Sequence, residues 1–196
     1  MVMKTKNARS FTLSPFSNEW GVQNLRRVIV GYTVLRDGIG LNMSPLTAKF
    51  NMRENYLSIR NRGSMILEFI PREESLYDPP KQTMLYREKK TFSMVPEHIH
   101  EFINLKSGSL EFQRDSEEGT KLLKINQTEN LWEFKLQIGT SYSKQIKLKQ
   151  SEMFYAQKLC EYSIPYLMGW YALGDARLAE QSLMQDPEPK DPFDSI

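Results

Sequence analysis

Apolar residues in the second half of the chain alternate with polar residues over four short runs, which is the pattern of strands that bury one face. Polar or glycine-containing turns separate these runs, which cover residues 110–114, 122–126, 132–138 and 146–149. From about Ser151 the spacing of apolar residues changes to three or four, and this predicts a long helix. Pro165 lies within it and should kink or break it. The apolar helical positions are Met153, Ala156, Cys160, Ile164, Leu167 and Tyr171.

The first half of the chain predicts the same order of strands followed by a helix. Residues 26–45 are rich in Val, Ile, Tyr and Leu and contain three glycines, which predicts a long, bent strand. Pro96 suits the first position of a short amphipathic helix that ends before Gly108. Between them we expect a hairpin near residues 57–70, a proline-containing loop over 71–83 and a strand over about 84–94. Strands followed by a helix, twice, favour an α+β fold with two antiparallel sheets.

The length of 196 residues and the hydrophobic fraction of 40% allow one domain, or two small fused halves, with a buried core. We expect a basic arm over residues 1–24, a single domain over 25–174 and an acidic tail over 175–196. The domain divides into halves at about 27–105 and 109–174. The first eighteen residues are basic, rich in Ser and Thr, and free of acids, which fits an organelle transit segment or a disordered basic arm equally well.

Charge is distributed unevenly along the chain, although the formal net charge is only +2. Residues 1–63 hold ten Lys and Arg against three acidic residues, so this part carries +7 and the remainder is acidic. Such asymmetry points to a polyanionic partner on one surface, and a merely solvated basic face remains the alternative.

The strand alternation gathers basic residues on one face, because neighbouring side chains of a strand point to opposite faces. In the second half, Lys124, Lys135, Lys147 and Lys149 oppose the apolar positions, and in the first half Arg60 and Arg62 do so. Both sheets would then present a Lys- and Arg-rich face suited to a phosphate backbone. Antiparallel sheets also keep solvated polar faces that bind nothing, so the pattern alone leaves both interpretations open.

Patterns of enzymatic chemistry are missing from the sequence, and we expect no catalytic residue, no metal and no cofactor. His98 and His100 are two positions apart on an expected helix, whereas helical zinc ligands need a spacing of three or four. The sequence has no phosphate-binding glycine loop and no nucleophile elbow. Cys160 is the only cysteine, so it can form no disulfide within the chain, and a buried thiol is the simplest interpretation. No apolar run approaches the ~20 residues of a spanning helix, so membrane insertion is not expected.

Three segments of the chain, IPYLMGW at residues 164–170, SMILEFIP at 64–71 and KKTFSM with the helix after it at 89–105, occur in the order of a known family. They resemble the Whirly-type single-stranded nucleic-acid-binding proteins, and within that superfamily the mitochondrial guide-RNA-binding proteins of trypanosomes and their relatives. The sequence IPYLMGW at residues 164–170 is similar to the methionine-proline-tyrosine-leucine-leucine-glycine-tryptophan of the family's last helix. SMILEFIP at residues 64–71 is similar to its apolar third strand, and KKTFSM with the following helix, at 89–105, is the third match. Their order and spacing agree with the family over roughly residues 27–174.

The resemblance implies two four-stranded antiparallel sheets packed crosswise, each followed by a helix, with the helices building a tetramer. Plant members carry a lysine-glycine-lysine-alanine-alanine-leucine motif where this chain has residues 36–41, and only Arg36 and Leu41 carry over. This departure favours the guide-RNA-binding branch, whose proteins work as a heterotetramer of two related chains and promote RNA annealing during mitochondrial RNA editing. It implies a location in the mitochondrial matrix.

Two hypotheses follow. In the first, the protein binds single-stranded RNA, a guide RNA above all, through phosphates, and leaves the bases free to anneal; single-stranded DNA is the alternative ligand. The expected RNA-binding residues are Arg36, Arg60, Arg62, Lys124, Lys135, Lys147 and Lys149, and the expected oligomer interface comprises Leu167, Met168, Trp170 and Tyr171. In the second hypothesis the protein is a structural adaptor of a ribonucleoprotein complex that binds other proteins through the long helix and the acidic tail.

Overall fold

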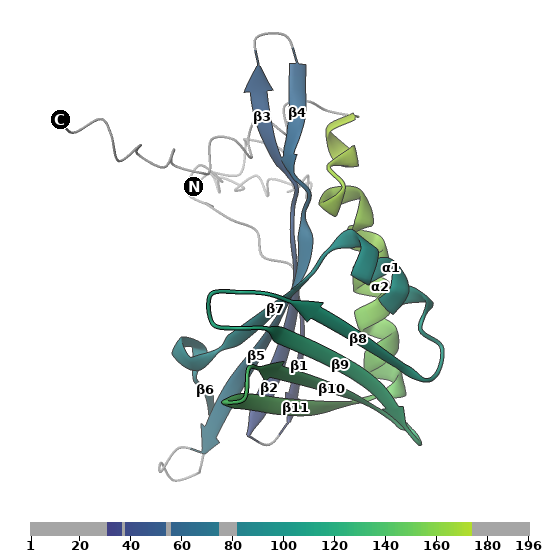
Figure 1. Cartoon of the computed structure of the whole chain (residues 1–196). Helices are drawn as coiled ribbons and strands as arrows, with labels where there is room; N and C mark the ends of the chain where they lie inside the picture. Colours follow the sequence, from purple (N-terminus) through teal and green to yellow (C-terminus); the bar gives the residue numbers. More distant parts are fainter. Residues whose placement is uncertain (1–30, 37, 54–55, 75–81, 174–196) are drawn as a thin grey trace, which may run out of the picture.

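The computed structural model describes residues 31–36, 38–53, 56–74 and 82–173, and the expected arm and tail lie outside this part of the chain. Its strands form two larger antiparallel sheets and a two-stranded ribbon (Figure 1). The ribbon consists of β3 (Lys49–Arg53) and β4 (Tyr56–Asn61). The arrangement is α+β, as the sequence predicts, with one helix after each sheet.

The first sheet has the strand order β1-β2-β5, with β6 and β7 both paired to the remaining edge of β5. All of its pairings are antiparallel. Helix α1 (Pro96–Asn104) follows it, with Pro96 at its start as expected. Its strands are β1 (Tyr32–Arg36), β2 (Ile39–Leu46), β5 (Ser64–Glu74), β6 (Gln82–Met84) and β7 (Lys90–Met94), and the short 3-10 helix η3 (Tyr86–Glu88) lies between the last two.

The second sheet is a four-stranded meander of order β11-β10-β9-β8, followed by α2 (Gln150–Leu167) and the 3-10 helix η4 (Trp170–Leu173). The alternation of apolar residues locates all four strands and the long helix. Residues 132, 134, 136 and 138 are all buried, as the period of two requires. The strands are β8 (Ser109–Arg114), β9 (Lys121–Thr128), β10 (Leu131–Ile138) and β11 (Tyr142–Lys149).

One hydrophobic core joins the inner faces of the two sheets, whose strands run crosswise, and both helices (Figure 1). Leu41 and Leu67 enter it from the first sheet and Phe134 from the second. Phe102 of α1 lies edge-on to Phe134, with ring centroids 6.0 Å apart. Burial of each such side chain contributes roughly 1.5–3 kcal/mol, so the shared core fixes the two sheets relative to each other.

The first half of the chain departs from the sequence-based expectation in three places. The expected hairpin near residues 57–70 does not form, because β4 pairs with β3, whereas β5 pairs with β2, β6 and β7. Where the structure describes it, from residue 31 on, the expected long, bent strand over 26–45 is a hairpin, because Gly38 adopts a φ of 73° in the tight turn that pairs Arg36 with Ile39. The expected strand over 84–94 is divided into β6, η3 and β7. The expectation of a four-stranded first sheet therefore holds only approximately, because β6 adds a fifth strand.

The end of α2 separates the ribbon from the first sheet. There the main-chain N–H of Ala48 donates to Tyr166 O at 3.2 Å, and that of Gly63 donates to Leu167 O at 2.7 Å. A Cβ on Gly63 would lie 2.2 Å from Leu46 O, so no side chain fits at this position. Helix α2 ends two residues beyond Pro165, so the proline lies in its last turn.

Candidate functional site

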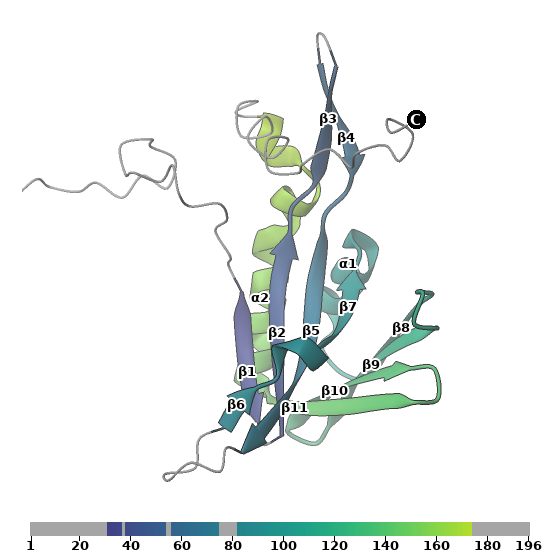
Figure 2. The ribbon, with the colours of Figure 1, turned by 90° about the vertical axis from the view of Figure 1, so that its left-hand side faces the viewer.

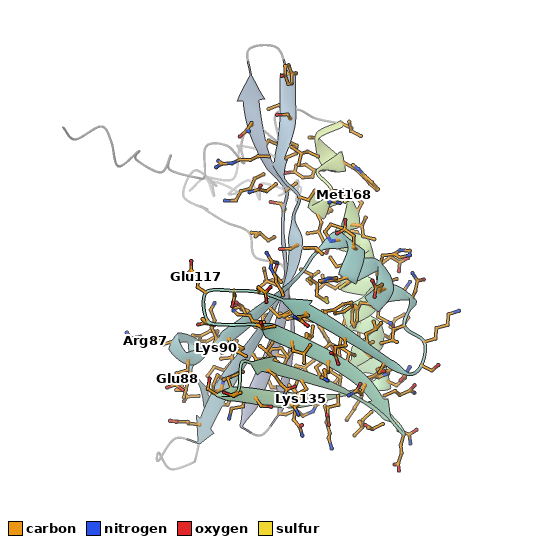
Figure 3. The ribbon with its side chains drawn as sticks, in the orientation of Figure 1. Arg87, Glu88, Lys90, Glu117, Lys135 and Met168 are labelled. Atoms are coloured by element: carbon orange, nitrogen blue, oxygen red, sulfur yellow. The ribbon has the colours of Figure 1, made fainter. Side chains whose placement is uncertain are left out.

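The outer face of the second sheet carries most of the basic residues that the sequence predicts for ligand binding. The strand register places Lys124 directly opposite Lys135, and Lys147 directly opposite Glu133. Lys149 ends β11, opposite Leu131. Figure 3 labels Lys135 on β10, in the sheet that faces the viewer. The structure thus brings four of the expected lysines together on one face, hereafter the lysine face: Lys124, Lys135, Lys147 and Lys149.

The lysines of this face differ in their partners. Lys124 Nζ lies 2.7 Å from Glu111 Oε2 of the neighbouring strand. Lys135 and Lys147 form no ion pair with another residue of the described chain. Lys147 is exposed and Lys135 is half-buried. An ammonium without a carboxylate partner can neutralise a phosphate, and contacts of this kind dominate the affinity of proteins for nucleic acids.

Arg36, which the sequence predicts to hold a phosphate, lies apart from the lysine face and makes contacts within the chain. Its guanidinium donates to Lys147 O at 3.0 Å and to Leu35 O at 2.8 Å, and it forms an ion pair with Glu152. The same carboxylate accepts a hydrogen bond from the main-chain N–H of Lys149 at the start of α2. Arg36 therefore links β1 to β11 and α2, with each of its three side-chain nitrogens bonded to another group of the chain.

Arg60 and Arg62 lie at the base of the ribbon rather than on a face of the first sheet. The pairing of β3 with β4 shifts between Lys49 and Phe50, which leaves Arg60 without a residue opposite it. Arg62 follows the end of β4, and its Nη1 lies 2.7 Å from Glu97 Oε1 of α1. Both side chains are exposed.

The outer face of the first sheet carries a hydrogen-bonded polar network, which corrects the expectation of a second basic face. Thr33 Oγ1 donates to Asn42 Oδ1 at 3.0 Å, and Asn42 Nδ2 donates to Glu68 Oε2 at 2.8 Å. Lys89 pairs with Glu68, so its charge is compensated. Figure 2 looks onto this face, with β6 and η3 crossing its lower part. Met84 approaches Gly40 so closely there that a Cβ on Gly40 would lie 3.0 Å from Met84 Cε.

The expected interface residues at the end of α2 differ in their burial. Leu167 is fully buried within its own chain, so it belongs to the core and offers no surface to a partner. Met168, labelled in Figure 3, and Tyr171 are half-buried, whereas Trp170 is 52% exposed. The ring of Tyr171 stacks on Tyr166 with centroids 5.7 Å apart.

The exposed side of α2 adds aromatic residues that the sequence-based interface missed. Tyr155 and Tyr162 are 58% and 73% exposed, and Phe154 lies beside them. Tyr162 and Tyr166 have centroids 6.1 Å apart, and their hydrogen bond raises the pKa of Tyr166 above its ordinary value. The period of three or four that selects the buried positions leaves these rings on the opposite side, so the helical pattern could have identified them. We name the exposed residues the aromatic side of α2: Phe154, Tyr155, Tyr162, Tyr166 and Trp170.

The seam where the two sheets meet contains basic residues that the sequence did not single out. Lys121 Nζ donates to Thr91 O, and Arg114 Nη1 donates to Ser93 O, each at 3.3 Å. Two residues of the second sheet thereby cover the edge of β7. Burial lowers the pKa of His98 at this seam, where its ring stacks on Phe112 at 4.5 Å and faces Phe92 at 6.4 Å. No sequence pattern shows these contacts, because they join residues on different sheets.

The described residues contain no cluster of three or more His, Cys, Asp or Glu side chains placed to hold a metal ion. None of the helices within the described ranges is long and apolar enough to cross a membrane.

Comparison with known proteins finds similarity at the level of structure. No protein-family model matches the sequence, and no curated protein matches it either. The crystal structure of WHY1 from Arabidopsis thaliana has a TM-score of 0.65 and 20% identity, with coverage of 79% of this chain and 93% of WHY1. WHY3 from the same plant gives 0.64 and 19%, covering 79% and 97% of the respective chains. The plant transcriptional regulator PBF-2 gives 0.63 and 20%, covering 77% and 88%. The chain thus has the Whirly fold.

Proposed function

We propose that this protein binds single-stranded nucleic acid by its phosphates on the lysine face of the second sheet. The observation that carries the proposal is the pair Lys135 and Lys147, which are held on a regular β-sheet and lack ion-pair partners among the described residues. Contacts to phosphates fix the position of a strand without selecting its bases. The protein therefore binds many sequences with similar affinity.

The proposed ligand is single-stranded RNA, and the proposed activity is RNA annealing. A strand that is held by its phosphates can turn its bases away from the protein and toward a complementary strand. The resemblance of residues 164–170 to the Whirly-type family, together with the departure from the plant motif at residues 36–41, supports a guide RNA as ligand, RNA editing or processing as the process and the mitochondrial matrix as the place. Single-stranded DNA is the alternative ligand, because phosphates are common to both.

The proposed assembly is a heterotetramer with a related chain, formed through the aromatic side of α2. Trp170 and Tyr162 expose more than half of their surface, and aromatic residues are enriched at protein interfaces. Several lysine faces in one complex would raise the effective concentration for a long strand. Mass measurement of the native complex with and without RNA tests this step, and a monomeric mass in both states would refute it. A protein adaptor without RNA binding is the competing function.

A salt titration tests the binding proposal. The affinity for a labelled oligouridylate and for its deoxy counterpart is measured by filter binding at several salt concentrations. The logarithm of affinity should fall linearly with the logarithm of salt, by roughly 0.7 for each neutralised phosphate. Scrambled mixed-base sequences should bind similarly. An affinity unchanged between low and moderate salt, or no binding at all, would support the adaptor instead.

A further inference from the structure

A small hollow lies where the end of β7, the start of α1 and the end of β8 meet. Its volume is about 150 Å³. The side chains at its wall are polar or charged with few exceptions, and they come from both sheets, the ribbon base and α1. They include Arg62, Ser64, Ser93, Pro96, Glu97 and Arg114. The hollow is therefore a polar site at the seam between the sheets, away from the outer lysine face.

Two arginines from distant parts of the chain converge on this hollow. Arg62 follows β4, and Arg114 is the last residue of β8. Both side chains are exposed, and Arg114 is held toward β7 by its hydrogen bond to Ser93 O. Arginine presents a planar set of donors that matches the oxygens of a phosphate in a bidentate arrangement. The chemistry of the wall therefore suits an anion with several oxygens.

A carboxylate of the chain already occupies part of this site. Glu97 Oε1 lies 2.7 Å from Arg62 Nη1. A hydrogen bond from its own main-chain N–H, followed by the bond from Arg62, holds the pKa of Glu97 below its usual range. Pro96 has no main-chain N–H and that of Glu97 already bonds to its own carboxylate, so the two arginines are the main donors that this site offers to an anion. Glu97 shows that negatively charged oxygen is stabilised at this position.

We propose that the hollow binds one phosphate group of a nucleic-acid strand through Arg62 and Arg114, and that this phosphate displaces the Glu97 carboxylate. The inference rests on the proposed function and adds a second contact region to it, at the seam beside β7. Glu97 then acts as an internal competitor that weakens binding, because the strand must break its ion pair with Arg62. Arg62 has a negative charge beside it in both states, from Glu97 in the free protein and from the phosphate in the complex.

Three substitutions at exposed positions test this proposal without disturbing the core. Arg114→Gln should weaken the binding of an oligouridylate about threefold to tenfold and lower the salt slope by about 0.7, because one phosphate contact is lost. Glu97→Gln should strengthen binding about threefold, because the competing charge is removed. Arg87→Gln is the control: Arg87 is exposed on η3, makes no ion pair with another described residue, and is labelled away from the seam in Figure 3.

The outcomes separate this proposal from the proposed function. Circular dichroism first establishes that all three variants are folded. In one outcome, Arg114→Gln and Glu97→Gln bind like the control Arg87→Gln, while Lys135→Gln binds more weakly. This outcome refutes the proposed phosphate site and supports binding by the lysine face. If the unmodified protein binds no single strand, both proposals fall. An increase with Glu97→Gln together with a decrease with Arg114→Gln supports the phosphate site, since simple loss of structure weakens binding in both variants.

The source of the phosphate is decided by the ends of the oligonucleotide. The same variants are measured with strands that carry either a phosphate or a hydroxyl at the 5′ end. An equal effect of Arg114→Gln on both strands identifies a phosphodiester within the strand. An effect confined to the phosphorylated strand identifies a terminal monophosphate.

Discussion

The outer faces of the two sheets are both polar, but their side chains differ in whether they bond to one another. On the first sheet, Thr33, Asn42 and Glu68 bond to one another, and β6 and η3 cross part of the face. On the second sheet, Lys135 and Lys147 carry charges that no described carboxylate pairs with. A polar face whose groups are mutually bonded contributes to stability, whereas a face with unpaired charge is available to a ligand.

The sheets also differ in continuity. The second sheet is an unbroken meander. In the first sheet, the chain leaves the sheet near Ala48 and Gly63, where the end of α2 bonds to it. The first sheet thus joins the ribbon, the helix and the core, while the second presents the lysine face. Under the proposed function, the two halves of the chain, although built in the same order, divide support and binding between them.

The largest effect is expected from breaking the junction in the first sheet. Gly63→Ala places a Cβ 2.2 Å from Leu46 O and 2.9 Å from Leu167 Cα, both backbone atoms that cannot turn aside. We expect the free energy of unfolding to fall by about 3 kcal/mol or more, because the strands must move apart. Denaturant unfolding measures it.

A glycine of the second sheet provides the control for that substitution. Gly139 has a φ of 53°, and no neighbouring atom lies within 4 Å of the point that a Cβ would occupy. Gly139→Ala should therefore cost only the ~1 kcal/mol of left-handed backbone. Equal losses in the two variants would contradict the steric role of Gly63.

The next largest effect is expected on binding, from removing the free charges of the second sheet. The double variant Lys135→Gln, Lys147→Gln should bind single strands about tenfold more weakly at low salt, with a salt slope lower by about 1.4, and should keep its stability. Filter binding and thermal unfolding measure both quantities.

The matched control removes the same charge elsewhere. Arg87 and Lys106 are exposed and make no ion pair with another described residue. Arg87→Gln, Lys106→Gln should change affinity less than twofold. If this control weakens binding as much as the double lysine variant, the position of the charge is irrelevant and the contrast between the sheets fails.

A smaller effect, on stability alone, is expected from the first sheet's polar network. Asn42→Ala removes one donor to Glu68 and one acceptor for Thr33, and should lower the free energy of unfolding by about 1 kcal/mol. The affinity for single strands should be unchanged. Ser44→Ala on the same face serves as the comparison, and a loss of RNA affinity in Asn42→Ala would assign binding to this sheet as well.

The smallest effect is expected at the seam that joins the two sheets. Burial lowers the pKa of His98 below 6.5, so the unfolded chain takes up a proton that the folded chain excludes. The contribution of His98 to the free energy of unfolding should be fully present above about pH 6.5 and should be lost as the pH drops below that value. The loss should be only a few tenths of a kcal/mol, because solvent screens this partly exposed ring. Glu97 and Glu101 oppose this shift, and Arg114 supports it.

His98→Phe isolates that contribution. The variant keeps a ring to stack on Phe112 but cannot take up a proton. Its unfolding free energy, measured from pH 7 to pH 5, should decline less than that of the unmodified protein. Identical pH profiles would remove His98 as a cause.

The sequence predicted the second half of the fold more closely than the first, because the second half depends on local order. In a meander, each strand pairs with its neighbour in the chain, so the alternation around Trp132 and Phe134 defines both strands and faces. The place of Lys135 on the outer face follows from the same alternation. The expected lysines of this sheet therefore share one face in the structure.

The parts that the sequence did not predict depend on contacts between distant residues. Arg36 and Glu152 are 116 positions apart, so no local pattern shows that this arginine is already paired. Leu167 has the spacing of an apolar helical position, but only the fold shows that it is fully buried in the shared core of its own chain. Gly63 and Gly169 can be read in the sequence, but the need for a glycine at these two positions appears only where the helix end meets the strands.

The meeting of α2 with the base of the ribbon has a consequence for hydrogen exchange. The amide protons of Ala48 and Gly63 are held by carbonyls of the last helical turn, so each can exchange with solvent only when that turn opens. The two amides, one between β2 and β3 and the other between β4 and β5, should therefore exchange at similar rates and slow together whenever the helix is stabilised. The helix end, the ribbon base and the first sheet form one cooperative unit, and loosening any one of them exposes the other two.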